Sequence, residues 1–150
     1  LHRPQDAIIC ACDGVNYLDS LKAAEEFFEA ANAALKVGGL LLFDISSQYK
    51  LENILGCNTF AEDEQGGAYI WKNNYDPKSR LIEMELTFFE RQDELYRRFT
   101  ERHIQRAHGV DELLSALNRA GFDAKAYDFE TMDPVKPDSE RVQFSGRKRR

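Results

Sequence analysis

Cysteine, long apolar runs and basic charge are all scarce in this sequence. The three cysteines, Cys10, Cys12 and Cys57, have neither metal-ligand nor redox spacing, so we expect buried thiols in a reducing cytoplasm. No apolar run is long enough to span a membrane, and the opening residues LHRPQDAII do not follow the plan of a signal peptide. These absences predict a cytoplasmic protein with no metal site and no membrane partner.

Charge and composition narrow the class further. A net charge of −6 argues against a nucleic-acid-binding protein built on a broad basic face, so we expect no nucleic-acid partner. Hydrophobic residues make up 43% of the chain and charged residues 31%, which is typical of a folded globular protein rather than a disordered one. A length of 150 residues suits one domain with a substantial core.

Two apolar runs near the start of the chain predict buried strands. The first, residues 7–12, stops at the polar turn Asp13-Gly14, and the second, residues 40–45, turns polar at Asp44. Continuous apolar runs favour parallel strands that are covered on both faces. We therefore expect a strand–helix–strand unit in which these two strands are adjacent and parallel.

Two stretches have helical periodicity. Between the two strands, Asp19 or Ser20 is placed to cap a helix that Gly38-Gly39 would end. The second helix lies in VDELLSALNRAGF, with Gly121 suited to the left-handed position after its end. The apolar stripes of the two helices are Leu21, Ala24, Phe28, Ala31 and Leu35, and then Leu113, Leu114 and Leu117.

The middle of the chain predicts an antiparallel meander. Three strand-like segments, GGAYIWKN, RLIEMELTFFE and LYRRFTERHIQRA, are separated by the turn signals YDPK and RQDE. Alternation places Ile82, Met84, Leu86 and Phe88 on one face of the second segment, and Leu95, Arg97, Phe99, Glu101, His103 and Gln105 on one face of the third. After the second helix, DAKAYDFE and ERVQFSGRK predict two closing strands.

This order of segments resembles the C-terminal portion of a class I S-adenosylmethionine-dependent methyltransferase of the small bacterial type with an antiparallel insert. The turn DGVNYL, the helix-to-strand stretch GGLLLFDI and the helix end ALNRAGF carry the resemblance. It implies an α/β fold: one partial Rossmann-like methyltransferase domain over residues 1–150, whose closing strand, near 141–147, runs antiparallel to the strands at 7–12 and 40–45. Its core would comprise 1–56 and 108–150, and the inserted meander, on the substrate side, 57–107.

The sequence departs from that family at its front. The glycine-rich loop that approaches the cofactor and the acidic residue that binds its ribose have no counterpart here, since the paired glycines Gly38-Gly39 and Gly66-Gly67 stand elsewhere. The resemblance implies that the complete protein binds S-adenosylmethionine, while this chain alone binds it weakly or not at all. The chain then represents the acceptor-side half of a methyltransferase and is inactive in isolation.

The resemblance also places candidate residues at the ends of the two apolar strands. Cofactor contacts are expected at Cys12, Asp13, Asn16 and Tyr17. Asp44 is a candidate to orient the acceptor, with Ser47 and Tyr49 at the same crevice. The alternative is local: Asp and Asn form turns by bonding their own backbone, and an Asp after a strand can cap the next turn.

In the meander, Trp71, Arg97 and Arg106 are expected to contact the substrate, and His103 is the histidine placed to act as a base. An arginine there would favour an anionic small-molecule acceptor. The alternative is a solvated strand face whose arginines pair with Glu83 and Glu85.

A second class of function is a non-catalytic α/β module that binds or dimerises. A nicotinamide dehydrogenase fits less well because the dinucleotide fingerprint is missing. Since the strand at 7–12 would lack its neighbour in the family fold, we expect it to be an open edge that pairs with a second copy or with the missing N-terminal half.

Overall fold

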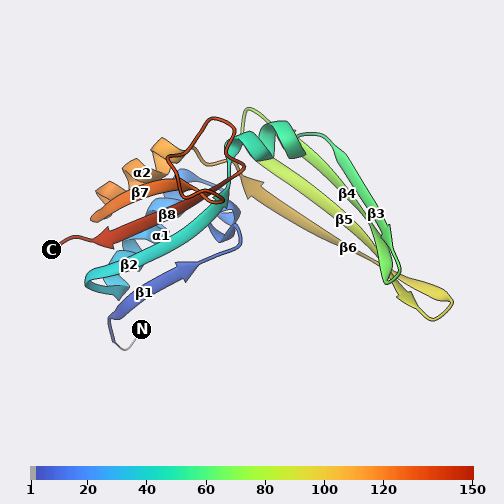
Figure 1. The fold of residues 1–150 in the computed structure, drawn as a ribbon, viewed down its shortest axis with the longest axis horizontal. Helices are drawn as coiled ribbons and strands as arrows, with labels where there is room; N and C mark the ends of the chain where they lie inside the picture. The colour runs from blue at the N-terminus through green and yellow to red at the C-terminus, as the bar shows by residue number, and fades with distance from the viewer. Residues whose placement is uncertain (1–2) are drawn as a thin grey trace.

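The chain forms two four-stranded sheets that stand side by side (Figure 1). The computed structural model describes residues 3–150. The core sheet has the strand order β1–β2–β8–β7, and the insert sheet has the order β3–β4–β5–β6 and projects away from the core (Figure 1). The α/β fold with an antiparallel insert is therefore confirmed.

Strands β1 (Gln5–Cys10) and β2 (Leu35–Ser46) of the core sheet are parallel, in register from Ala7 opposite Leu40 to Cys10 opposite Phe43. Strand β8 (Arg141–Lys148) runs antiparallel to β2, and β7 (Phe122–Asp128) completes the sheet at the far edge. Both the parallel pair and the antiparallel closing strand confirm the prediction. The order leaves β1 at an edge of the core sheet.

Helices α1 (Leu21–Ala34) and α2 (Val110–Arg119) cover one face of the core sheet (Figure 1). The rings of Phe28, Phe43 and Phe144 form a buried stack there, with centroids 5.4 Å apart for the first pair and 4.7 Å for the second. Fully burying side chains of this size contributes about 1.5–3 kcal/mol each, so this stack is a main source of stability. The opposite face of the sheet is only partly covered.

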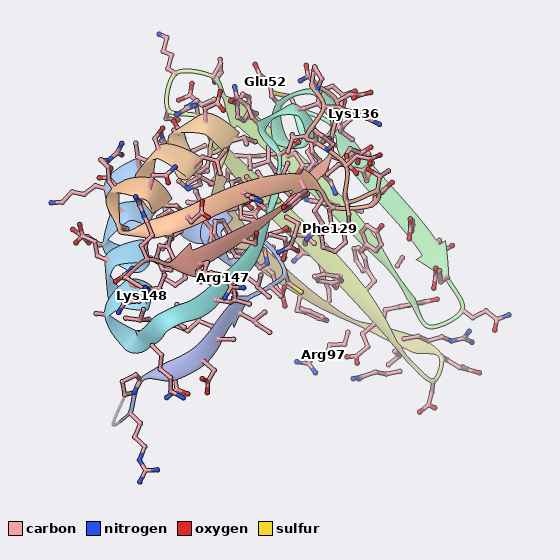
Figure 2. The ribbon with its side chains drawn as sticks, turned by 60° about the vertical axis from the view of Figure 1, so that its left-hand side comes forward. Glu52, Arg97, Phe129, Lys136, Arg147 and Lys148 are labelled. Carbon is pink, nitrogen blue, oxygen red and sulfur yellow. The ribbon has the colours of Figure 1, made fainter. Side chains whose placement is uncertain are left out.

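Helix α1 begins as expected and ends earlier than expected. The Oγ atom of Ser20 accepts a hydrogen bond from the backbone N–H of Ala23 at 3.2 Å, which confirms the cap. The expected stop at Gly38-Gly39 is wrong, because the helix ends at Ala34 and those glycines lie inside β2. The Lys148 ammonium donates to the carbonyls of Asn32 and Leu35 and satisfies the helix end from across the sheet (Figure 2).

The insert sheet is antiparallel throughout and contains one strand more than the sequence predicted. Strands β4 (Gly67–Asp76), β5 (Leu81–Gln92) and β6 (Leu95–Arg106) match the three expected segments. Strand β3 (Thr59–Glu64) was missed, since its segment TFAEDE is mostly exposed and acidic and so has little β-strand signal. The short helical turn η1 (Gly14–Tyr17) joins β1 to α1, and η2 (Lys50–Leu55) joins β2 to β3.

The cysteines do not behave as expected. Cys12 and Cys57 are exposed and Cys10 is half-buried, so the expectation of buried thiols is wrong. Cys12 lies in the turn after β1, and Cys57 in the turn after η2, where no packing covers them. Among residues 3–150, no helix combines the length and apolar character needed to cross a membrane, and no cluster of three or more metal-ligating side chains occurs.

His108 connects the end of the insert to the core. Its side chain is completely buried, and its Nε2–H donates to the carbonyl of Leu18 at 2.9 Å. Glu112 accepts from the backbone N–H of Gly109 at 2.9 Å and from Arg80 at 2.6 Å, which fixes the start of α2 beside it. Burial lowers the pKa of His108 below its ordinary value, more than the bond to Leu18 raises it.

We predict that acid weakens the fold through this histidine. Because the folded-state pKa of His108 lies below that of the unfolded chain, the unfolded chain takes up more protons as the pH falls through about 6.5, and the free energy of unfolding decreases. Urea unfolding followed by circular dichroism at about pH 7.5 and about pH 5.5 should show this decrease. His108→Gln, which keeps a donor for Leu18, should flatten the pH dependence; an unchanged slope would contradict the assignment.

Candidate functional site

The carboxyl ends of β1 and β2 meet at one edge of the core sheet, and the buried Asp44 organises that edge. One of its oxygens accepts from the backbone N–H of Cys12 at 2.9 Å, and the other accepts from the N–H of Asp13 at 3.4 Å. Arg141, at the start of β8, donates to Asp44 and lies 2.9 Å from Oδ1 of Asp13. The carboxylate of Asp44 is therefore occupied on both oxygens.

These bonds hold a strained turn. Cys12 and Asp13 have φ angles of 59° and 60°, a left-handed conformation that costs a residue other than glycine roughly 1–3 kcal/mol. Hydrogen bonds to a charged group stabilise by about 1.5–3 kcal/mol each, which is enough to offset that cost. Asp44 thus shapes the turn that presents Asp13 and Tyr17, and it has no free oxygen to act as a base.

Asn16 joins the core to the insert. Its side-chain Nδ2 donates to the carbonyls of Ser46 and Arg106, and its Oδ1 accepts from the N–H of Ser46, each at 3.0 Å. The side chain is completely buried. One amide therefore fixes the turn after β1 against the end of β2 and the end of β6, and all of its hydrogen-bonding atoms are engaged by backbone.

A cleft lies between the two sheets at this junction. The hydroxyl of Tyr17 lies 3.0 Å from Nδ1 of His103 on β6, and the rings meet edge to face. The Nε2 atom of His103 lies 3.4 Å from a carboxylate oxygen of Glu101. A cavity of ≈ 300 Å³ opens beside this pair, lined in part by Asp13, Trp71, Met84, Gln105 and Arg141.

Trp71 contributes an unused hydrogen-bond donor to the cleft. Its ring packs against Phe60 with centroids 5.6 Å apart, and its Nε1–H is buried without a partner. A buried indole N–H usually finds an acceptor. Trp71 is therefore a donor without a partner in a side chain that lines the cleft.

Comparison with known proteins identifies the architecture. The chain is 32% identical over 145 residues to a Bacillus subtilis protein named "Putative methyltransferase YqeM", with 95% of the chain and 58% of the relative aligned. The crystal structure of an S-adenosylmethionine-dependent methyltransferase from Clostridium acetobutylicum matches all of the chain at TM-score 0.93 and 30% identity, and 61% of that protein is covered. The chain is thus similar to the C-terminal portion of S-adenosylmethionine-dependent methyltransferases. The expected resemblance is thereby confirmed.

A more distant match shares the fold. The S-adenosylmethionine-bound amino pentose methyltransferase CalS10 from Micromonospora echinaspora superposes with TM-score 0.70 at 18% identity, over 98% of this chain and 60% of that protein. No family model matches the chain. The chain spans 58–59% of the length of the two curated relatives that it matches.

The structure brings some of the expected site residues together at the cleft and leaves others apart. Asp13, Tyr17, Trp71 and His103 line the cavity. Cys12 contributes its backbone N–H to Asp44 and exposes its side chain.

The remaining candidates have structural contacts. Ser47 accepts from the N–H of Lys50, and the carbonyl of Tyr49 accepts from Asn53, so both serve η2. Arg106 donates to the carbonyl of Ser79. Arg97 lies far out on the insert sheet, beside Glu90 (Figure 2).

Arg141 is the site residue that sequence reasoning missed. It follows a loop and opens the last strand, so nothing in its local pattern indicates a role. The antiparallel direction of β8 is the one available signal, because it brings the start of that strand to the edge where β1 and β2 end. Its guanidinium also lies over the ring of Phe129, 5.6 Å from the centroid.

Replacing Asn16 should destabilise the fold, because its side chain connects the insert to the core. Asn16→Asp removes both donated hydrogen bonds and places a carboxylate in a buried site, so we expect the free energy of unfolding to fall by about 2–5 kcal/mol. Urea unfolding measures it, with Asn74→Asp on the exposed face of β4 as the matched control. A loss below about 1 kcal/mol would mean that the junction does not depend on this amide.

Proposed function

We propose that the chain is the acceptor-side half of an enzyme that transfers a methyl group from S-adenosylmethionine to a small-molecule acceptor. The observation that carries the proposal is the cleft between Asp13 and Tyr17 on the core and Trp71 and His103 on the insert. It lies at the carboxyl edge of parallel strands, where ligands of open α/β sheets bind. The match to the Clostridium acetobutylicum methyltransferase supports the class of reaction.

The turn after β1 suits one side of the cofactor. Oδ1 of Asp13 is buried and forms an ion pair with Arg141 at 2.9 Å, and we assign the Asp13 carboxylate at the cavity wall to the ammonium group of the cofactor's methionine part. When bound, the cofactor supplies an electrophilic methyl group on a sulfonium. The glycine-rich loop and the ribose-binding carboxylate are not in this sequence, so the turn contributes only part of the binding site.

Tyr17 and His103 suit the acceptor side. An amine or thiolate needs mainly alignment and exclusion of water, whereas a hydroxyl gains from a base. We assign that role to His103 acting through Tyr17: the Tyr17 oxygen takes the acceptor's proton as its own hydroxyl proton passes to Nδ1 of His103, while Glu101 lies beside Nε2. The Nε1–H of Trp71 and the amide of Gln105 would position the acceptor.

Calorimetric titration with S-adenosylhomocysteine tests this division of the site. The complete protein should bind it in the micromolar range. The 150-residue chain should bind in the millimolar range or not at all, and should transfer no methyl group, because each unpaired buried polar group on the ligand costs about 1–3 kcal/mol. Micromolar binding by the chain alone would show that the cofactor site lies within it, and the absence of binding by the complete protein would contradict the methyltransferase proposal.

Strand β1 favours a second role, as an edge that recruits another polypeptide strand. Within residues 3–150 it pairs only with β2, and the Ile9 side chain is 71% exposed. On the partly covered face of the core sheet, a hollow of ≈ 440 Å³ is lined in part by Ile9, Leu42, Tyr127 and Met132. An apolar open edge beside a partly covered face tends to pair, so we propose that the isolated chain dimerises through β1.

Ile9→Lys should convert the isolated chain to a monomer. Since Ile9 is exposed, the lysine would not enter the core, and the circular dichroism spectrum should stay that of the folded chain. Leu95→Lys, at a residue that is 76% exposed on the far insert, is the control that should leave the dimer intact. Light scattering gives the mass; a folded wild-type chain that remains monomeric at high concentration would exclude this role.

A further inference from the structure

The far half of the insert sheet carries an ordered row of aromatic rings, well away from the cleft. On one face, Tyr69 of β4 pairs with Phe88 of β5, which pairs with Phe99 of β6. The ring centroids are 6.3 Å and 5.0 Å apart along the row. None of these rings contributes to the core clusters, and the Phe99 side chain is 36% exposed.

Gly67 makes a hollow beside this row. In the next row of the same face, Glu64 pairs with Gly67, and Gly67 pairs with Glu90. The φ angle of Gly67 is 153°, and a Cβ there would clash with the carbonyl oxygen of Phe89. Glycine is therefore required at this position, and the space above it is not filled by a side chain of its own. The result is a cavity of ≈ 310 Å³ with aromatic rings on one side and carboxylates on two others.

Three carboxylates line the hollow. Glu62 completes the aromatic row opposite Tyr69, so Glu62, Glu64 and Glu90 all line the cavity. Partial burial and then the neighbouring Glu62 and Glu64 raise the pKa of Tyr69. Because adjacent strands lie about 4.8 Å apart, a cation above Gly67 would be about 5 Å from the strand on each side, within reach of both Glu64 and Glu90.

One cation of the chain itself already uses part of this surface. The Arg97 guanidinium lies 5.6 Å from the centroid of Phe99, and its Nη1 is 3.7 Å from a carboxylate oxygen of Glu90. Glu62 and Glu64 take part in no ion pair with a basic residue among the residues that the structure describes. The rings and carboxylates therefore have capacity for a second positive group above Gly67.

We propose that this hollow is a binding site for an organic cation, specifically the ammonium group of a small molecule. Aromatic faces attract alkylated ammonium groups through their quadrupole, and the carboxylates add charge attraction. A neutral molecule of the same shape gains only apolar contact and should bind more weakly. The site is separate from the cleft and does not depend on methyl transfer.

Choline and its neutral isostere 3,3-dimethyl-1-butanol test the site on the 150-residue chain. Two-dimensional NMR should show saturable choline shifts centred on the Gly67 and Tyr69 amides, and the isostere should bind at least about fivefold more weakly. Equal affinities for choline and the isostere would mean that the hollow binds only through apolar contact, which would overturn the proposal. The absence of saturable shifts would overturn it as well.

Variants measure how much the carboxylates and the aromatic ring of Phe99 each contribute to choline binding. The double variant Glu64→Gln and Glu90→Gln should weaken choline binding about tenfold, and Phe99→Leu should weaken it by a smaller factor. Glu85→Gln, on the opposite face of β5, is the matched control and should leave binding unchanged. Folding of each variant is checked by the dispersion of the same spectra. Unchanged binding in the double variant would overturn the assignment to this hollow.

Discussion

The side-chain amide of Asn16 is the contact on which the arrangement of the two sheets depends. It makes three hydrogen bonds of 3.0 Å to backbone groups of β2 and β6, and it does so where no water reaches it. A buried polar group that loses its partners costs more than a satisfied one contributes, so the position tolerates little change. This contact holds the turn after β1 against the insert, so that the two form opposite walls of the cleft.

A second polar cluster gives that cleft its shape. Asp44 and Arg141 are brought together because β8 runs antiparallel to β2, and Asp44 then holds the N–H groups of Cys12 and Asp13. Left-handed geometry at two consecutive residues is the kind of local strain that surrounding contacts must maintain, and such strain concentrates at functional sites. The tertiary pairing of strands thus determines how Asp13 and Tyr17 face the insert.

Patterns of single elements were predictable from the sequence, and contacts between distant elements were not. Apolar runs and turn residues indicated β1, β2, α2 and the β4–β6 meander, because those signals are local. The end of α1 was misplaced because β2 already begins at Leu35, where Lys148, more than a hundred residues away, donates to the carbonyls of Asn32 and Leu35. The sequence correctly placed Asn16 and Asp44 at the ends of the two apolar strands. Their partners, Arg106 and Arg141, are distant in the sequence and become neighbours only through the fold.

The comparisons relate this chain to part of S-adenosylmethionine-dependent methyltransferases, and the account that we propose for its cleft is that the cleft receives the methyl acceptor. The most direct measurement is a crystal structure of the complete protein with S-adenosylhomocysteine. The account predicts that the sulfur atom points into the cleft between Asp13, Tyr17 and His103, with the ammonium group near the turn after β1. A ligand whose sulfur faces away from these residues, or that leaves His103 and Tyr17 outside the reacting space, would contradict it.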